Sequence, residues 1–347
     1  MEALVKYKKG DGFLELQDVE KPQIGDNEVL IEIKAAAICG TDLHIYHDQF
    51  PYWPPVTLGH EFSGIIVEKG KNVSNWEIGD RVVGEPHTLA CGNCYYCRTG
   101  NIQNCNSKRS PGWGIDGCFA KYMRYPEPKL LHKLPDSVSF EEGSLIEPLA
   151  NVVTDVIERG NIHAGDNVVV IGPGPIGLMA CMVAKAVGAG KVFLLGTDED
   201  EAIRAPLAKK AGYIDLFINS MKEDAQEIIK KHTNDLGADF VIEASGSQGG
   251  IASAIAVARK YATVVGIGLP VRDTINFPYL PAMKKVLTLV FNMSTAYTSW
   301  DRSINLVASK KLDLKPLISD VVPLSKWEES FKKLEAKQGI KIVFSFN

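Results

Sequence analysis

A glycine-rich turn between a strand and a helix is the feature that most constrains how this chain folds. The stretch VVVIGPGPIG carries Gly172, Gly174 and Gly177 at G-x-G-x-x-G spacing, directly after an apolar run and at the start of a helical segment. The first glycine permits a tight turn, the second lets the backbone approach a pyrophosphate, and the third lets the helix pack closely on the strand. The helix N-terminus then presents free N–H groups to the anion. The motif predicts a dinucleotide site that includes Pro175 and Ile176.

The segments around this turn predict two kinds of domain. After it, apolar runs such as KVFLL, ADFVIEAS and ATVVGIG alternate with helical stretches, which indicates a parallel sheet covered on both faces. Before it, residues 1–126 contain short strand-like runs broken by glycine and proline, which is typical of a partly antiparallel sheet or barrel. The C-terminal residues return to a mixed pattern and close with IKIVFSF. A chain of 347 residues is long enough for two domains.

The end of the second predicted strand bears on which nicotinamide dinucleotide is bound. A carboxylate at this place bonds the ribose hydroxyls of NAD, but here the position is held by Gly196 within GTDEDE. Glycine leaves room for a 2′-phosphate. However, four carboxylates follow and no basic residue occurs before Arg204, so a phosphate would be repelled. We expect NAD rather than NADP, with Asp198 as the ribose contact; a solvated acidic loop is the alternative for each of these carboxylates.

Four of the seven cysteines form a cluster in CGNCYYCRTGNIQNC, at Cys91, Cys94, Cys97 and Cys105. The odd total and an N-terminus without an apolar signal core favour metal ligands in a reducing cytoplasm over a disulfide framework. Four thiolates on a tight loop fit one tetrahedral zinc ion and leave no open place, so we expect this zinc to be structural. The net charge of −4 and the lack of a basic helix after the cluster disfavour nucleic-acid and membrane partners.

A second set of ligand types is spread along the chain. ICGTDLHIY contains Cys39, LGHEFSG contains His60 and Glu61, and LIEPLANVVT contains Glu147. A sulfur, a nitrogen and one carboxylate make the mixed site that a catalytic zinc with an open position uses. Taken singly, Cys39 also fits a core cysteine, His60 a structural histidine and Glu147 the first turn of a helix. Their joint occurrence beside a dinucleotide fold favours the metal site.

Together these residues resemble the zinc alcohol dehydrogenases, the zinc-dependent medium-chain dehydrogenase family. GHEFSGIIVEKGKNV fits that family's signature G-H-E-x-x-G-x5-G-x-x-V, and the CGTD, EPL, four-cysteine and late glycine motifs occur in the family's order. The subgroup resembled is that of sorbitol (polyol) and L-threonine dehydrogenases. The resemblance implies an α/β fold, in which a doubly wound Rossmann sheet is inserted in a β-rich GroES-like catalytic domain. The implied boundaries are 1–153 for the catalytic domain with a structural zinc lobe at 88–108, 154–293 for the Rossmann domain, and 294–347 for the return to the catalytic domain.

The resemblance also implies a role for each metal-site residue. Cys39, His60 and Glu61 would hold the catalytic zinc, which gives two zinc ions per chain with the structural one. Glu147 would be an exchangeable fourth ligand or would bond the zinc-bound water. Asp42 would orient His60 by accepting its other ring N–H.

Two further residues would carry the proton released by the alcohol. The Thr41 hydroxyl would receive it and pass it through the cofactor ribose to His44, because an imidazole can deliver a proton to solvent. Local hydrogen bonding in a turn is the alternative for both residues.

The implied activity is hydride transfer between a secondary alcohol, of the polyol or sugar-alcohol type, and a nicotinamide cofactor. The alternatives are L-threonine 3-dehydrogenation and oxidation of a bulkier hydrophobic alcohol such as butanediol or a hydroxysteroid. The bulkier alcohol fits if Phe50, Tyr52, Trp53 and Trp113 line the pocket mouth instead of a core or an interface. A zinc-stabilised binding protein without chemistry would have a broken catalytic set, which this chain does not have. We expect a cytoplasmic homodimer or homotetramer.

Overall fold

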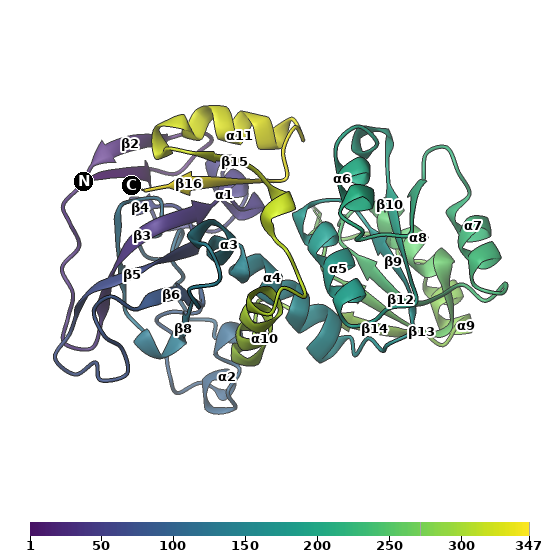
Figure 1. The fold of residues 1–347 in the computed structure, drawn as a ribbon, viewed down its shortest axis with the longest axis horizontal. Coiled ribbons are helices and arrows are strands. Elements are labelled where there is room, and N and C mark those ends of the chain that lie inside the picture. The colour runs from purple at the N-terminus through teal and green to yellow at the C-terminus, as the bar shows by residue number, and fades with distance from the viewer. Residues whose placement is uncertain (271, 347) are drawn as a thin grey trace. The chain divides into compact units, whose positions relative to one another are not determined.

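The computed structural model describes residues 1–270 and 272–346, which form two compact units. The first unit comprises Met1–Pro148, Thr295–Ala308 and Leu317–Asn347, and the second comprises Leu149–Ser294 and Ser309–Pro316. The chain thus leaves the first unit, builds most of the second and returns, with Ser309–Pro316 again in the second, and each unit has its own β-structure and apolar core (Figure 1). Among the described residues, every helix is too short or too polar to cross a membrane.

Two sheets form the frame of the first unit. The larger has the order β15-β16-β3-β5-β6-β8, with β7 also paired to β3, and the smaller has the order β2-β1-β4. All pairs are antiparallel except β15 with β16. The strands are β1 (Glu2–Lys6), β2 (Leu14–Asp18), β3 (Val29–Ala37), β4 (Val56–Thr57), β5 (Glu61–Lys69), β6 (Arg81–Gly84), β7 (Tyr122–Tyr125), β8 (Leu131–Lys133), β15 (Ile318–Val322) and β16 (Lys341–Ser345).

Strand β3 is the centre of this frame. Its sequence VLIEIKAAA is buried along most of its length, because it pairs with β5 and β7 and also with β16 from the opposite end of the chain. In Figure 1 the yellow C-terminal strand β16 therefore runs beside the purple N-terminal strand β3. This pairing brings the last strand next to the point where β3 ends, just before Cys39.

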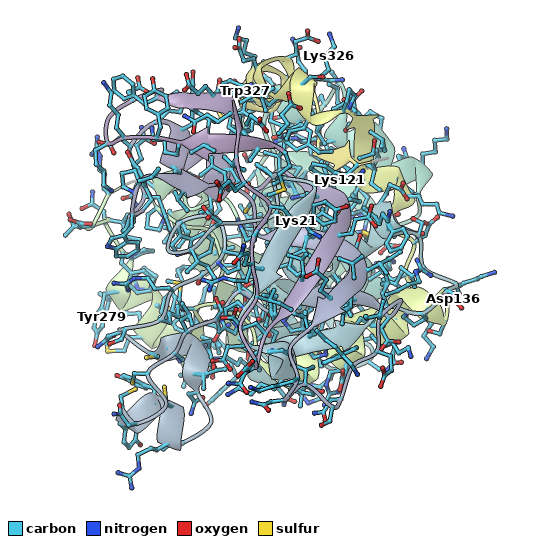
Figure 2. The ribbon with its side chains drawn as sticks, turned by 90° about the vertical axis from the view of Figure 1, so that its left-hand side faces the viewer. Lys21, Lys121, Asp136, Tyr279, Lys326 and Trp327 are labelled. Carbon is cyan, nitrogen blue, oxygen red and sulfur yellow. The ribbon has the colours of Figure 1, made fainter. Side chains whose placement is uncertain are left out.

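Short helices close the first unit around this sheet. In α11, Trp327 (labelled in Figure 2) and Phe331 pack edge to face against each other and against Tyr46 at the end of α1. Helix α3 begins at a capping box in which Ser139 and Glu142 each accept the other's backbone N–H. The helices are α1 (Gly40–Tyr46), α2 (Tyr95–Arg98), α3 (Phe140–Ser144), α10 (Tyr297–Ala308) and α11 (Trp327–Glu335), and α4 (Ile146–Val153) runs across the boundary of the two units.

The second unit is the predicted doubly wound parallel sheet. Its strand order is β11-β10-β9-β12-β13-β14, so the chain proceeds outward on one side of β9 and then returns to build the other side. The strands are β9 (Asn167–Ile171), β10 (Lys191–Gly196), β11 (Leu216–Asn219), β12 (Ala238–Glu243), β13 (Ala258–Gly266) and β14 (Thr288–Phe291). The helices are α5 (Pro175–Ala186), α6 (Arg204–Lys210), α7 (Ala225–His232), α8 (Gln248–Val257) and α9 (Tyr279–Lys284).

The edge strand β14 was not anticipated from the sequence. It is four residues long, and Leu289 and Phe291 remain exposed, so it lacks the alternation that marks a half-buried strand. Its register with β13 nevertheless places it firmly in the sheet, for example through Val265 opposite Val290.

A buried carboxylate follows α4, where the helix widens into a π-helical turn at Thr154–Arg159. Asp155 is 4% exposed, and within the described part of the chain its Oδ1 has no hydrogen-bond partner. Burial raises the pKa of Asp155 to about 7, although a hydrogen bond from Asn292 and the charge of Arg159 oppose this shift. Asn292 directly follows β14, so Asp155 lies at the carboxyl end of that strand.

Replacing Asp155 should change how stability depends on pH. In the unfolded chain an aspartate has a pKa of about 4, so between about pH 4 and pH 7 the folded state holds the proton more tightly. Wild-type stability then falls by up to about 1.4 kcal/mol for each pH unit as the pH rises through this window. Asp155→Asn does not titrate and keeps an acceptor for Asn292. We expect it to raise the Tm more at pH 8 than at pH 5 in calorimetry, and an equal change at both pH values would contradict this.

Candidate functional site

Cys39 lies where β3 gives way to α1, and it is the N-cap residue of that helix. The Cys39 N–H donates to Asp42 Oδ2 at 2.9 Å, so the helix start is fixed by the side chain three residues later. The thiol lies 3.7 Å from Thr41 Oγ1. The first turn of α1 thus holds the thiol and a hydroxyl side by side.

Glu61 is the first residue of β5 and His60 directly precedes it, and both are almost fully buried. The preceding Gly59 has a φ of +90°, and a Cβ at this position would collide with the ring of Phe119. Only glycine therefore lets the chain enter β5 at this angle. The Gly59 N–H donates to Asp42 Oδ1 at 3.2 Å.

Asp42 consequently joins the two ligand-bearing segments through their backbones. It is completely buried and accepts the N–H groups of both Cys39 and Gly59. The expected hydrogen bond from the His60 ring is not formed, because Asp42 Oδ1 lies 3.8 Å from His60 Nδ1. The carboxylate is used by the backbone N–H groups, and its influence on the ring is electrostatic.

The ligand atoms of Cys39, His60 and Glu61 all lie within 4.8 Å of one another. Among the described residues, His60 Nδ1 and Glu61 Oε1 are buried and have no hydrogen-bond partner. Buried polar atoms without partners are costly: His60 Nδ1 faces the Asp42 carboxylate at 3.8 Å, and a metal ion would satisfy Glu61 Oε1. A thiolate, an imidazole and a carboxylate are zinc ligands, so these residues fit the ion that the resemblance implies.

The charges of this centre explain its titration. Burial disfavours the charged imidazolium of His60, but Cys39, Asp42 and Glu147 outweigh burial and raise the His60 pKa to about 10. Burial and the charge of Glu147 raise the pKa of Glu61 to about 7, against the opposing effect of Lys341. Glu147, in the first turn of α4, is therefore close enough to act on both ligands, although it lies outside the tight group.

Lys341 is the residue of this centre that the sequence analysis missed. It is 2% exposed, and its ammonium donates to the Ile38 carbonyl at 2.7 Å and to Glu61 Oε2. Cys39, Glu61 and Asp42 raise its pKa in spite of burial. The available signal was a lysine inside the apolar run IKIVFSF, which is unusual in a buried strand.

The four clustered cysteines form a second group. The ligand atoms of Cys91, Cys94, Cys97 and Cys105 also lie within 4.8 Å of one another, around α2 and the short 3₁₀ turn Ile102–Asn104. The N–H of Cys91 points to the Cys105 sulfur at 3.4 Å and lowers the pKa of that thiol to about 6, against a smaller effect of burial. Helix α2 has no buried residues, so the lobe has little apolar core of its own. Four thiols in this arrangement fit a zinc ion with a filled coordination sphere.

The other predicted residues of the first unit lie in different surroundings. His44 is exposed, and its Nδ1 lies 3.3 Å from Gln49 Oε1. The Trp113 ring packs edge to face on His60, with centroids 5.0 Å apart, and Phe50 packs on Trp113. Tyr52 is buried and donates to Asp48, so it belongs to the core.

The glycine turn of the second unit has the shape of an anion cradle. Gly172 has a φ of +96°, and a Cβ on Gly177 would collide with the Gly172 carbonyl oxygen. Gly174 caps α5 and faces open space, since a Cβ there would meet no atom within 4 Å. Pro175 and Ile176 follow as the first residues of the helix. The cradle fits a dinucleotide pyrophosphate.

Asp198 follows β10 but is not an isolated carboxylate. It accepts hydrogen bonds from Asn219 at 2.7 Å and from Lys222 at 2.8 Å, and these partners lower its pKa. Sequence reasoning counted Arg204 as the nearest cation, yet Arg204 pairs with Asp200 at 3.2 Å. Lys222 comes from the loop after β11, which the parallel pairing brings beside β10.

Comparison with known proteins identifies the family. The model "Alcohol dehydrogenase GroES-like domain" matches residues 25–136, and "Zinc-binding dehydrogenase" matches residues 175–309. The chain belongs to the zinc-type alcohol dehydrogenase family. It is therefore an oxidoreductase that acts on CH–OH groups with zinc and a nicotinamide cofactor, and the predicted GroES-like and Rossmann architecture is confirmed.

Several relatives match the chain from end to end. A sorbitol dehydrogenase of Halalkalibacterium halodurans is 35% identical over 99% of both chains. An L-threonine 3-dehydrogenase of Bacillus subtilis is 36% identical over 99% of this chain and 98% of its own. A solved structure of a putative zinc-binding dehydrogenase from Sinorhizobium meliloti, bound to NADP, has a TM-score of 0.91 at 28% identity and covers 99% of each chain.

Serine substitutions should separate the two metal-binding groups. In Cys39→Ser a poor ligand replaces a thiolate, so we expect the loss of one of two zinc ions and of alcohol turnover by more than about a hundredfold. Cys94→Ser should lose the other ion and lower the Tm, because the lobe has no core to replace it. Elemental analysis, kinetics and thermal melts measure these effects. Full zinc content and full turnover in Cys39→Ser would refute its assignment as a ligand.

Proposed function

We propose that this enzyme transfers hydride between a secondary alcohol of the polyol or sugar-alcohol type and a nicotinamide cofactor, with NAD preferred over NADP. The observation that carries this proposal is the close group of half-buried Cys39 with buried His60 and Glu61, three unlike ligands that would leave a place for substrate on a zinc ion. The sorbitol dehydrogenase among its relatives supports the polyol class.

Each residue of the centre has a role in this proposal. Cys39, His60 and Glu61 hold the catalytic zinc, and Glu147 serves as an exchangeable ligand or as a hydrogen-bond partner of the substrate hydroxyl. When bound, zinc acts as a Lewis acid that lowers the pKa of the alcohol, and the dinucleotide accepts the hydride.

The alcohol proton leaves through the first turn of α1. The Thr41 hydroxyl, 3.7 Å from the Cys39 sulfur, receives the proton, and His44 delivers it to solvent. The exposure of His44 and its contact with the neutral Gln49 amide support this role.

The cofactor contacts belong to the second unit. Gly172, Gly174 and Gly177, with Pro175 and Ile176, receive the pyrophosphate, and Asp198 bonds the adenosine ribose. We also propose domain boundaries at residues 1–153, 154–293 and 294–347, and a structural zinc on Cys91, Cys94, Cys97 and Cys105. Thiol ligands of this kind suit a cytoplasmic enzyme.

A homodimer or homotetramer fits the surface of the second unit. The edge strand β14 exposes Leu289 and Phe291, and α9 exposes Tyr279 (Figure 2) and Met283. An unpaired apolar edge strand is normally covered in the native assembly, and a second copy of this chain would cover it.

The alternative substrates differ in what they require from the first unit. Threonine needs a cation for its carboxylate, and Lys341, the buried cation at the centre, is already paired with Glu61. A bulkier alcohol such as butanediol is favoured by the contact of Trp113 with His60 and Phe50. This second candidate therefore remains beside the polyols, and threonine is disfavoured.

A substrate panel tests the proposal directly. Sorbitol and other polyols, threonine, butanediol and a hydroxysteroid are offered with NAD and with NADP, and reduced cofactor is followed by its near-ultraviolet absorbance. We expect the highest kcat/KM for a polyol with NAD, and chelation of zinc should abolish the signal. A protein that retains two zinc ions but reduces neither cofactor with any of these alcohols would refute the proposal.

Replacement of Asp198 tests the cofactor preference. A hydrogen bond to a carboxylate contributes about 1.5 to 3 kcal/mol, so Asp198→Ala should lower kcat/KM for NAD about tenfold or more. The kcat/KM for NADP should rise, because Lys222 is released from Asp198 and can meet the 2′-phosphate. Glu201→Ala is the matched control, because Glu201 binds the same Asn219 and Lys222. Equal effects of the two substitutions on both cofactors would argue against a ribose contact through Asp198.

A further inference from the structure

The C-terminal strand of the chain supplies a charged group to the metal centre. Lys341 is the first residue of β16, and the Ile38 N–H donates to the Ile342 carbonyl at 3.0 Å, so β16 runs beside the segment that leads to Cys39. The Lys341 ammonium donates to the Ile38 carbonyl at 2.7 Å and to Glu61 Oε2. Both Lys341 and Glu61 are buried, so neither partner is replaced by water.

The two oxygens of Glu61 have different environments. Oε2 is held by the Lys341 ammonium, whereas Oε1 is buried and has no hydrogen-bond partner among the described residues. A ligand atom of Glu61 lies within 4.8 Å of those of Cys39 and His60. A carboxylate near a metal can give one oxygen or both, and a second oxygen would raise a four-coordinate ion to five-coordination and crowd the place that an alcohol needs.

We propose that Lys341 is a positioning residue of the catalytic metal centre: it occupies Oε2 of Glu61, restricts that carboxylate to one metal-directed oxygen, and so keeps a coordination place open for the alcohol. The inference rests on the proposed zinc chemistry and adds to it a residue from the far end of the chain. It also gives the ion pair a function beyond stability, since a buried ion pair by itself stabilises a fold little compared with apolar residues of the same size.

Cobalt(II) in place of zinc reports the coordination number in its visible spectrum, independently of turnover. The full-length protein is loaded with Co²⁺, and Lys341→Met is compared with the wild type. We expect the variant's ligand-field bands to weaken, because a second Glu61 oxygen makes the ion five-coordinate. Its affinity for imidazole, which competes for the open place, should fall about tenfold or more.

Three further variants separate positioning from a merely structural role. Lys341→Arg keeps the charge and should retain the wild-type spectrum. Lys285→Met is the matched control, because Lys285 is a half-buried lysine that donates to the carbonyls of Ile255, Ala256 and Ala258 in the second unit, and it should leave the cobalt spectrum unchanged.

A double variant that combines Lys341→Met with Glu61→Gln removes both charges of the pair. It covers the case in which Lys341→Met alone does not fold, because removing a whole buried ion pair destabilises a protein far less than removing one partner. This double variant should not show the five-coordinate spectrum, because the second carboxylate oxygen is gone.

The outcomes separate this inference from the proposed function. If wild-type protein shows no thiolate-bound cobalt beyond that of the four-cysteine lobe, the zinc chemistry itself is refuted. If the wild type binds cobalt at both groups, and Lys341→Met shows the same spectrum and the same imidazole affinity as the wild type, Lys341 has only a structural role. If the double variant shows the same weakened bands as Lys341→Met, the change does not come from Glu61, and the inference fails.

Discussion

The fold of the first unit depends on bringing several acidic side chains close together and compensating their charge. Asp42, Glu61 and Glu147 are buried there beside the half-buried Cys39, and each buried carboxylate would be unfavourable in a dry interior without a partner. Two backbone N–H groups that donate to Asp42, and the Lys341 ammonium that donates to Glu61, compensate part of this negative charge. In our proposal a divalent cation would compensate the remaining negative charge. The centre thus fits the metal that we propose, and Asp42 joins the two segments through the backbone N–H groups of Cys39 and Gly59.

The same requirement accounts for the order of the chain. Lys341 can reach Glu61 only if the last strand returns beside β3, and this is the pairing observed between β16 and β3. Most of the second unit, Leu149–Ser294, lies in sequence between the N-terminal and C-terminal parts of the first. An interrupted unit of this kind requires contacts between segments far apart in the sequence, but it lets residues from both ends of the chain meet at a single site.

The two cysteine environments illustrate that density of ligands is not a measure of reactivity. The cluster of Cys91, Cys94, Cys97 and Cys105 would fill a coordination sphere with four equal thiolates, so no group can exchange there. Cys39 stands alone among unlike ligands, and Trp113 against His60 gives the centre an apolar wall. Unlike ligands in a desolvated place are what a reacting metal requires, whereas the cluster stabilises a lobe without a core.

The sequence by itself determined the parts of this protein that depend on local spacing. The glycine turn at Gly172 and the alternation after it determine the parallel sheet, because strand, tight turn and helix are encoded within a few residues. The spacing of the four clustered cysteines likewise predicted that they lie together. Only the tertiary structure decided which distant groups meet: Lys341 with Glu61, Lys222 with Asp198, and Asp42 with two backbone N–H groups in place of the His60 ring. These contacts are set by strand pairing and loop geometry between segments far apart in the chain, and no local pattern carries that information.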